Sequence, residues 1–177
     1  MNSLLGTGHE VVEGRRGIGG HQSASSRTDV WLTPPEILRA LGPFDLDPCA
    51  CPEPRPWPTA ATHWVREDGP LNRPWLGRVW LNPPYGTGIV EPWLHRMAEH
   101  QNGMAILFAR TETAVFHETV WQRGSAILFL RGRPHFYRAD GRRAAGNSGG
   151  PVCLVAFGAW DRAILSDCGL EGRYLDL

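Results

Sequence analysis

The sequence contains no lysine, so arginine supplies all 18 of its basic residues. Acidic residues also number 18, and the formal net charge is therefore zero. Because no global field draws such a chain onto nucleic acid, any electrostatic surface for a polyanion has to be local. Guanidinium groups suit phosphate recognition, although a GC-rich coding bias explains the exclusive use of arginine more simply.

Long apolar segments are absent as well. No run approaches the roughly 20 residues that span a membrane, and the N-terminus lacks the apolar centre of a signal peptide. The four cysteines form no CxxC pair and have no matching pair with histidines, so we expect no metal site. These absences predict a soluble, intracellular protein whose cysteines are reduced thiols.

What the sequence does contain is ordinary for a globular domain, with 42% hydrophobic and 20% charged residues. A length of 177 residues fits one domain with a substantial core. Residues 1–27 are rich in glycine, serine and arginine and show no periodicity, which predicts a flexible N-terminal tail. Residues 28–177 would then form the folded domain.

Apolar runs typical of strands alternate along this domain with segments of helical spacing. Thr33 is placed to cap the first helix, Gly42 to end it, and Gly103 to end a later one. The alternation predicts an α/β doubly wound sheet that is mostly parallel. The strands near 125–137 and 151–158 have no helix between them and would pair antiparallel at one edge. The expected strands are 44–47, 79–81, 104–108, 125–130 and 152–157, and the expected helices are 36–41, 59–64, 89–100, 113–122 and 161–167.

A stiff loop follows the apolar residues 79–81. It reads Asn82-Pro83-Pro84-Tyr85, and its prolines forbid both a continued strand and an immediate helix. The asparagine is thereby held at the carboxyl end of a strand, where open α/β sheets bind ligands. Its side-chain oxygen and the next backbone carbonyl can both accept from one exocyclic amine, and the tyrosine can stack on the ring that carries it. The alternative is a proline-rich turn with a buried tyrosine.

Acidic residues occupy comparable places. Asp47 ends the expected strand 44–47, and Asp68 lies in a long proline-rich connection of the kind that is often functional. One carboxylate can pair with a ligand ammonium or hydroxyl, and the other can accept from an adenine amine. The alternatives are a cap or turn residue for Asp47 and a solvated Asp-Gly turn for Asp68. Trp64 and Trp75 fit the core as well as they fit a ligand-stacking role.

Five stretches of the chain follow one another in the order Asp29-Val30-Trp31-Leu32-Thr33-Pro34-Pro35, Phe44-Asp45-Leu46-Asp47-Pro48-Cys49-Ala50, Trp80-Leu81-Asn82-Pro83-Pro84-Tyr85, Ala109-Arg110-Thr111-Glu112-Thr113 and Leu130-Arg131-Gly132-Arg133-Pro134-His135-Phe136. In this order they resemble the bacteriophage-type, Dam-like DNA N6-adenine methyltransferases over roughly residues 29 to 158. Asn-Pro-Pro-Tyr alone occurs in several amino-methylating families, whereas the ordered set is much more discriminating. The resemblance implies a Rossmann-like methyltransferase fold that binds S-adenosylmethionine, in the host cytoplasm if the protein is phage-encoded.

Carried over position by position, the resemblance implies a joint site for cofactor and target base. Thr33 and Pro34 would contact the methionine part of the cofactor, Asp47 its amino group and Asp68 its adenine. An acid after the second strand commonly meets the ribose in this family. That strand cannot be placed from the sequence, so Glu53 is only a candidate. The full cofactor set is Trp31, Thr33, Pro34, Asp47, Pro48 and Asp68, and the catalytic set that holds the target adenine is Asn82, Pro83, Pro84 and Tyr85.

The partner that the resemblance implies is double-stranded DNA, from which the target adenine is flipped out. Basic residues accumulate between residues 123 and 143 against a single acid, Asp140, and a solvated arginine face is the alternative. Phe136 could stack on a base or be an ordinary strand residue. The residues expected to contact DNA are Arg110, Arg131, Arg133, Phe136, Arg142 and Arg143.

Other activities use similar loops. Cytosine N4, an RNA adenine or a protein glutamine amide are planar amines that such a site could methylate. Asparagine at the first loop position argues against cytosine N4, for which the family resemblance favours serine. A non-catalytic nucleic-acid-binding module is a further alternative, against which the intact Asp47, Asn82 and Tyr85 argue.

Overall fold

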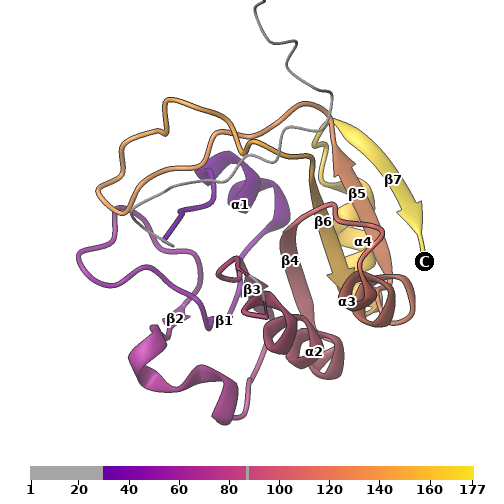
Figure 1. The fold of residues 1–177 in the computed structure, drawn as a ribbon, viewed down its shortest axis with the longest axis horizontal. Coiled ribbons are helices and arrows are strands. Elements are labelled where there is room, and N and C mark those ends of the chain that lie inside the picture. Colours follow the sequence, from indigo (N-terminus) through magenta and orange to yellow (C-terminus); the bar gives the residue numbers. More distant parts are fainter. Residues whose placement is uncertain (1–29, 87) are drawn as a thin grey trace, which may run out of the picture.

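The computed structural model describes residues 30–86 and 88–177, so the tail expected at 1–27 lies outside the described residues. Within these residues a seven-stranded sheet carries helices on both faces (Figure 1). No helix in this part of the chain is long and apolar enough to cross a membrane.

The sheet is mixed, with its strands in the order β2-β1-β3-β4-β6-β5-β7. The strands are β1 Leu46–Asp47, β2 Thr62–His63, β3 Val79–Leu81, β4 Gly103–Phe108, β5 Ala126–Leu130, β6 Val152–Phe157 and β7 Gly172–Asp176. β2, β1, β3 and β4 run parallel to one another. β6 is antiparallel to both of its neighbours, and β7 is antiparallel to β5. The prediction of a mostly parallel sheet is therefore wrong, while the α/β class is confirmed.

The antiparallel pair of β5 and β6 forms as predicted, but it does not lie at the edge. β6 inserts between β4 and β5, and β7 adds a further strand outside β5. β6 is buried along its whole length, as a central strand should be. β7 has mostly exposed residues, and without an apolar run its sequence gave no strand signal.

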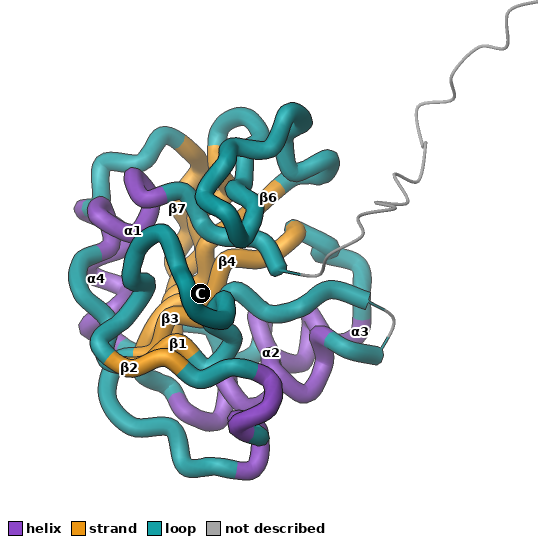
Figure 2. Tube along the Cα trace, turned by 90° about the vertical axis from the view of Figure 1, so that its left-hand side faces the viewer, coloured by secondary structure: helices purple, strands orange, loops and turns teal. Residues whose placement is uncertain are grey.

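Helices flank the sheet on both sides. Figure 2 shows α1 (Pro35–Leu41) and α4 (Ala159–Asp167) on one face and α2 (Val90–His100) and α3 (Ala114–Phe116) on the other. α3 continues into the π-helical segment His117–Trp121. These helices occupy the places expected from the sequence, apart from their end residues.

Alternation along the strands divides the core into two layers. In β3, Val79 and Leu81 belong to the cluster that includes Trp93 and Met97 of α2, whereas Trp80 belongs to the cluster of α1 and α4. This period of two is what a strand buried on both faces requires.

Three local expectations fail. The N-cap of α1 is Pro34, and no side chain caps the helix, so Thr33 does not have the capping role. α2 ends on Gln101, which takes a left-handed conformation with φ of 56°, and Gly103 instead begins β4. The expected helix 59–64 does not form. Its residues Thr62–His63 instead find backbone partners as β2 against β1, and this tertiary pairing overrides the weak local helical preference.

A buried ion pair joins the amino end of β3 to α4. Arg78 Nε donates to Asp161 Oδ1 at 2.7 Å, and its Nη1 donates to the carbonyl of Pro43 at 2.8 Å. The guanidinium also lies 4.2 Å from the centre of the Phe44 ring. Burial raises the pKa of Asp161, and the bond and charge of Arg78 oppose that rise. The pair therefore holds β3 against α4 at the end of the sheet opposite Asn82.

We expect Asp161→Ala to lower the free energy of unfolding by about 3–5 kcal/mol, because it leaves the Arg78 charge buried without its partner. Urea denaturation measures this loss. Asp140→Ala, which removes the acid of the exposed pair Asp140–Arg142, is the matched control and should leave stability unchanged. Equal stability of the two variants would contradict the assignment.

Candidate active site

Asn82 leaves β3 directly after Leu81, and its amide orientation is fixed by one contact. The Nδ2 group donates to the backbone carbonyl of Trp31 at 2.7 Å. Because a carbonyl only accepts, the amide nitrogen must face it, which leaves Oδ1 free as an acceptor. Among the described residues no hydrogen bond uses Asn82 Oδ1 or the carbonyl of Pro83. Two unused acceptors thus lie on consecutive residues of a stiff loop.

The segment that holds Asn82 is itself tied to a distant part of the chain. Leu32 exchanges two backbone hydrogen bonds with Tyr137, at 2.8 and 3.0 Å. The next residue, Thr33, is 1% exposed, and its hydroxyl has no hydrogen-bond partner among the described residues. A buried hydroxyl without a partner is uncommon in a folded protein. It marks a position where a ligand group can supply the missing bond.

Asp47 ends β1 and is 3% exposed. Its Oδ1 accepts from the backbone N–H of Cys49 at 2.9 Å, and its Oδ2 accepts from the Thr59 hydroxyl. Burial raises the pKa of Asp47 from 3.8 to about 6, against the lowering effect of these bonds and of the Arg55 charge. At neutral pH the site therefore holds a buried negative charge that no cation contacts directly within the described residues.

Strand pairing brings Asp47 and Asn82 to the same end of the sheet. β1 and β3 are parallel neighbours in the register Leu46↔Val79, so Asp47 and Asn82 leave the sheet in the same direction. Asn82 bonds Trp31, two residues before Thr33. Three of the five stretches that carry the family resemblance therefore meet at the carboxyl ends of the parallel strands. Pro34 and Pro48 are buried there, and Trp31 is half-buried.

Asp68 and Glu53 are placed differently. Asp68 is exposed, lies on the short 3₁₀ helix Arg66–Asp68, and accepts from the backbone N–H of Val65 at 2.8 Å. Glu53 is exposed and paired with Arg55 in the loop before β2. Since β2 is the second strand, Glu53 does not follow it, and the acids that do are Glu67 and Asp68.

Tyr85 has a structural contact that the sequence did not reveal. Its hydroxyl donates to the carbonyl of Ile106 at 3.1 Å and accepts from the N–H of Phe108 at 3.2 Å. These groups belong to β4, beyond Ala105, the residue that pairs with the last residue of β3. The ring packs edge-to-face on Phe108, with 4.7 Å between centroids. Burial of the hydroxyl raises the pKa of Tyr85, although 36% of the residue is exposed.

Three of the expected DNA contacts, Phe136, Arg142 and Arg143, lie on an ordered ribbon of residues 134–148. Residues 134–148 are joined by backbone bonds, and Gly141 at the tip lies beside Pro56 and Trp57. In Figure 1 this segment, in orange, extends from β5 towards the loop that follows β1. Phe136 is half-buried and packs on the core cluster of α1, but it lies outside the strands, in the connection between β5 and β6.

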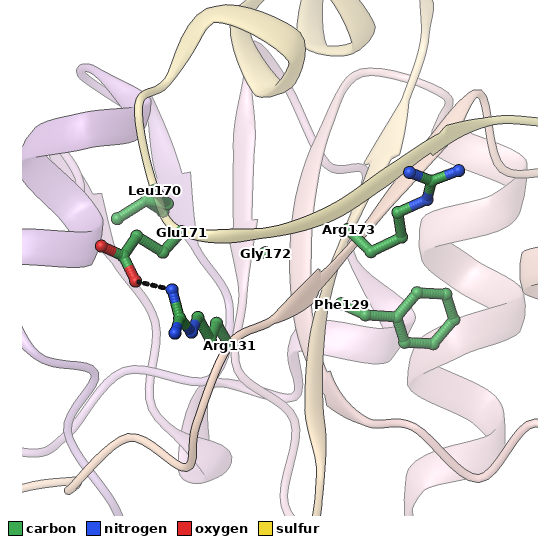
Figure 3. A pocket seen from close by; sticks show the side chains of 6 residues that line it. All are labelled: Phe129, Arg131, Leu170, Glu171, Gly172 and Arg173. Atoms are coloured by element: carbon green, nitrogen blue, oxygen red, sulfur yellow. Dashed lines mark hydrogen bonds and ion pairs between the residues drawn. The ribbon is translucent and has the colours of Figure 1, made fainter.

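The arginines of this region differ in their partners. Arg131 pairs with Glu171 at 3.4 Å beside an open hollow between β5 and β7 (Figure 3). Arg133 donates to the carbonyl of Gly149, and Arg142 pairs with Asp140. Arg110 and Arg143 are exposed, and no side-chain bond of either is found within the described residues.

Sequence reasoning missed two residues that bond or support Asp47. Thr59 lies twelve residues away, and His63 accepts the N–H of Thr59. The parallel pairing of β1 with β2 brings Thr59 and His63 close to Asp47. Their spacing along the sequence therefore does not predict this contact.

A buried carboxylate and a half-buried amide therefore lie at the carboxyl ends of adjacent parallel strands, where α/β enzymes typically bind their ligands. A family model described as Dam, DNA N-6-adenine-methyltransferase, matches residues 20–167, and the chain belongs to this family. The family implies methylation of adenine N6 in DNA. No curated protein and no solved structure matches the chain.

Asp47→Asn should make stability depend differently on pH. The folded protein binds a proton at Asp47 between pH 3.8 and about 6, where the unfolded chain has lost it. The wild-type protein thus loses stability from this group as pH rises, and the loss is complete above pH 6. We expect the variant to gain free energy of unfolding relative to wild type across this range, by at most about 3 kcal/mol. Urea titrations from pH 4.5 to 7.5 measure the difference, and a constant difference would contradict it.

Tyr85→Phe should lower the free energy of unfolding by about 1–2 kcal/mol, because two backbone groups of β4 lose their partner. The aromatic ring remains in place. Tyr174→Phe, which removes an exposed hydroxyl bonded to Asp176, serves as the control and should have a smaller effect. Thermal denaturation of both variants decides whether the hydroxyl of Tyr85 supports β4.

Proposed function

We propose that this protein is a site-specific DNA methyltransferase that transfers the methyl group of S-adenosylmethionine to adenine N6 in double-stranded DNA, on a Rossmann-like methyltransferase fold. The observation that carries the proposal is the Asn82 amide. Trp31 holds its nitrogen, and its oxygen stays free next to the free carbonyl of Pro83. Membership of the Dam family supports the same reaction.

The residues at the strand ends fit the cofactor. Asp47 carries a negative charge at pH 7 with lone pairs to spare, as the partner of the cofactor's ammonium group must. Thr33 offers a buried hydroxyl that lacks a partner, and with Pro34 would bind the methionine part. Trp31 and Pro48 would complete this wall. S-adenosylmethionine, when bound, supplies a methyl group made electrophilic by its sulfonium.

The far end of the cofactor would meet the segment after β2. Asp68 is assigned to the cofactor adenine, with one carboxylate oxygen already used in its own turn. Glu67 replaces Glu53 as the candidate for the ribose hydroxyls, because it follows the second strand and is exposed.

The acceptor side works by alignment. Asn82 Oδ1 and the Pro83 carbonyl would accept the two N–H groups of the adenine amine and so favour a more tetrahedral nitrogen. In this geometry the nitrogen lone pair would be less delocalised into the ring, and the amine could accept the methyl group as the bond from methyl carbon to sulfur breaks and leaves a neutral thioether. The same two acceptors stabilise the positive charge that develops on nitrogen, and positioning and electrostatics together lower the barrier. An amide is a weak base, so the proton leaves to water after methyl transfer.

The target adenine has to leave the duplex to reach Asn82. The exposed part of the Tyr85 ring, with Pro84 beside it, would replace the stacking that the base loses. Arg110 and Arg143 are the arginines best placed for phosphates, because their guanidinium groups are exposed and free of side-chain partners in the described part of the chain. Arg131, Arg133 and Arg142 would exchange their present partners for phosphate, and such contacts make binding salt-dependent. Phe136, which is half-buried, could contact a base only after leaving its core contact.

Asn82→Ala should reduce methyl transfer by about 100-fold or more, the loss seen when a transition-state contact is removed, while cofactor affinity stays near wild type. Asp47→Ala should instead weaken cofactor binding. Asn102→Ala is the matched control, because Asn102 makes a similar amide-to-carbonyl bond, to Gly77 at 2.9 Å, at the opposite end of the sheet.

Tritiated methyl transfer to unmethylated DNA and calorimetry with S-adenosylmethionine measure the two quantities. Nucleoside analysis of the product should give N6-methyladenosine in its deoxy form. An Asn82→Ala protein that still methylates at the wild-type rate, or label recovered on cytosine, would overturn the proposal.

A further inference from the structure

The carboxylate of Asp47 is fixed from two directions along the chain. Cys49 N–H donates to Oδ1 at 2.9 Å, and the Thr59 hydroxyl donates to Oδ2. A carboxylate offers about four lone-pair sites, so each oxygen can accept one more donor. These two bonds set the plane of the carboxylate before any ligand arrives.

Thr59 is held in turn by His63. The Nε2 atom of His63 accepts the backbone N–H of Thr59 at 3.1 Å and that of Ala60 at 3.3 Å. Because these N–H groups can only donate, Nε2 carries no proton and the ring hydrogen is on Nδ1. His63 is in register with Asp47 across the β1–β2 pair, so the ring and the carboxylate lie on adjacent strands.

The surrounding charges favour this arrangement at neutral pH. Burial lowers the pKa of His63, and the charge of Arg55 lowers it further, so the ring stays neutral and can accept. The Thr59 bond lowers the pKa of Asp47, so its removal would favour the protonated acid, which cannot pair with an ammonium. The other titratable groups nearby are Glu53, which is paired with Arg55, and the thiols of Cys49 and Cys51, whose pKa values burial raises.

We propose that Thr59 is a positioning residue for the cofactor-binding carboxylate. Its hydroxyl keeps Asp47 ionised and orients it towards a primary ammonium group, and His63 holds Thr59 in place. This inference rests on the proposed function, because it assumes that the ammonium belongs to S-adenosylmethionine.

Thr59→Val tests the role, because it removes the hydroxyl and keeps the branched shape. Thr59→Ser returns the donor, and Thr62→Val is the control at an exposed threonine on β2. The carboxyl carbon signal of Asp47, followed by NMR in the cofactor-free protein, gives its pKa. Calorimetry from pH 5.5 to 8.5 gives the affinity for S-adenosylmethionine.

Thr59→Val should raise the pKa of Asp47 from about 6 to about 7, as expected for loss of one hydrogen bond to a charged group. The smaller ionised fraction should weaken cofactor affinity about twofold at pH 7 and about eightfold at pH 5.5. Affinity should recover towards pH 8.5, where Asp47 ionises again. Thr59→Ser and Thr62→Val should behave like the wild-type protein. His63→Ala should shift both quantities in the direction of Thr59→Val, and less than additively when the two changes are combined.

An Asp47 pKa that Thr59→Val leaves unchanged would overturn the inference. So would a loss of affinity that is equal at every pH, because a merely structural role predicts that result. Failure of the proposed function looks different, since the wild-type protein itself would then bind no cofactor at any pH.

Discussion

The hydrogen bond from Asn82 Nδ2 to the Trp31 carbonyl is the contact on which the rest of the site depends. It crosses 51 residues of sequence and joins the end of β3 to the segment before α1. That segment continues into Leu32, bonded to Tyr137, and into Thr33, whose buried hydroxyl is unused. One hydrogen bond thus fixes the orientation of the Asn82 amide and ties the end of β3 to the segment before α1. An asparagine turned the other way would place two oxygens face to face.

The two ends of the sheet treat charge in opposite ways. At the amino ends, Arg78 and Asp161 neutralise each other within the core, and the pair supports the packing of α4. At the carboxyl ends, Asp47 is buried with only neutral donors in contact, and burial keeps its pKa near 6. A buried carboxylate without a cationic partner lowers the free energy of unfolding. Such groups are typical of functional sites, where a bound ligand can supply the missing partner. The loss of stability at the carboxyl ends is tolerated because the ion pair at the amino ends and the two apolar layers hold the strands in place.

Sequence alone located the parts of the molecule that carry strong local signals. The continuous apolar runs predicted β3, β4 and β6, and the two prolines after Asn82 placed it at a strand end. The order of motifs predicted the family, which the family model confirms. Features made only by tertiary pairing could not be predicted. β2 has two residues and exists because β1 offers it partners, β7 is an exposed edge strand, and the Thr59–Asp47 bond spans twelve residues.

The backbone pairing of Leu32 with Tyr137 has a consequence for engineering. The ribbon folds back after Tyr137, which also pairs with Arg143, so the anchoring position and the outer turn are separate pieces of chain. Residues 138–142 can therefore be exchanged for those of another member of the family while the anchor is retained. Deleting the whole ribbon would release Leu32 and, through Trp31, the amide on which transfer chemistry would depend. Chimeras that exchange this turn should accordingly join the two parents inside residues 138–142 and not at the ends of β5 and β6.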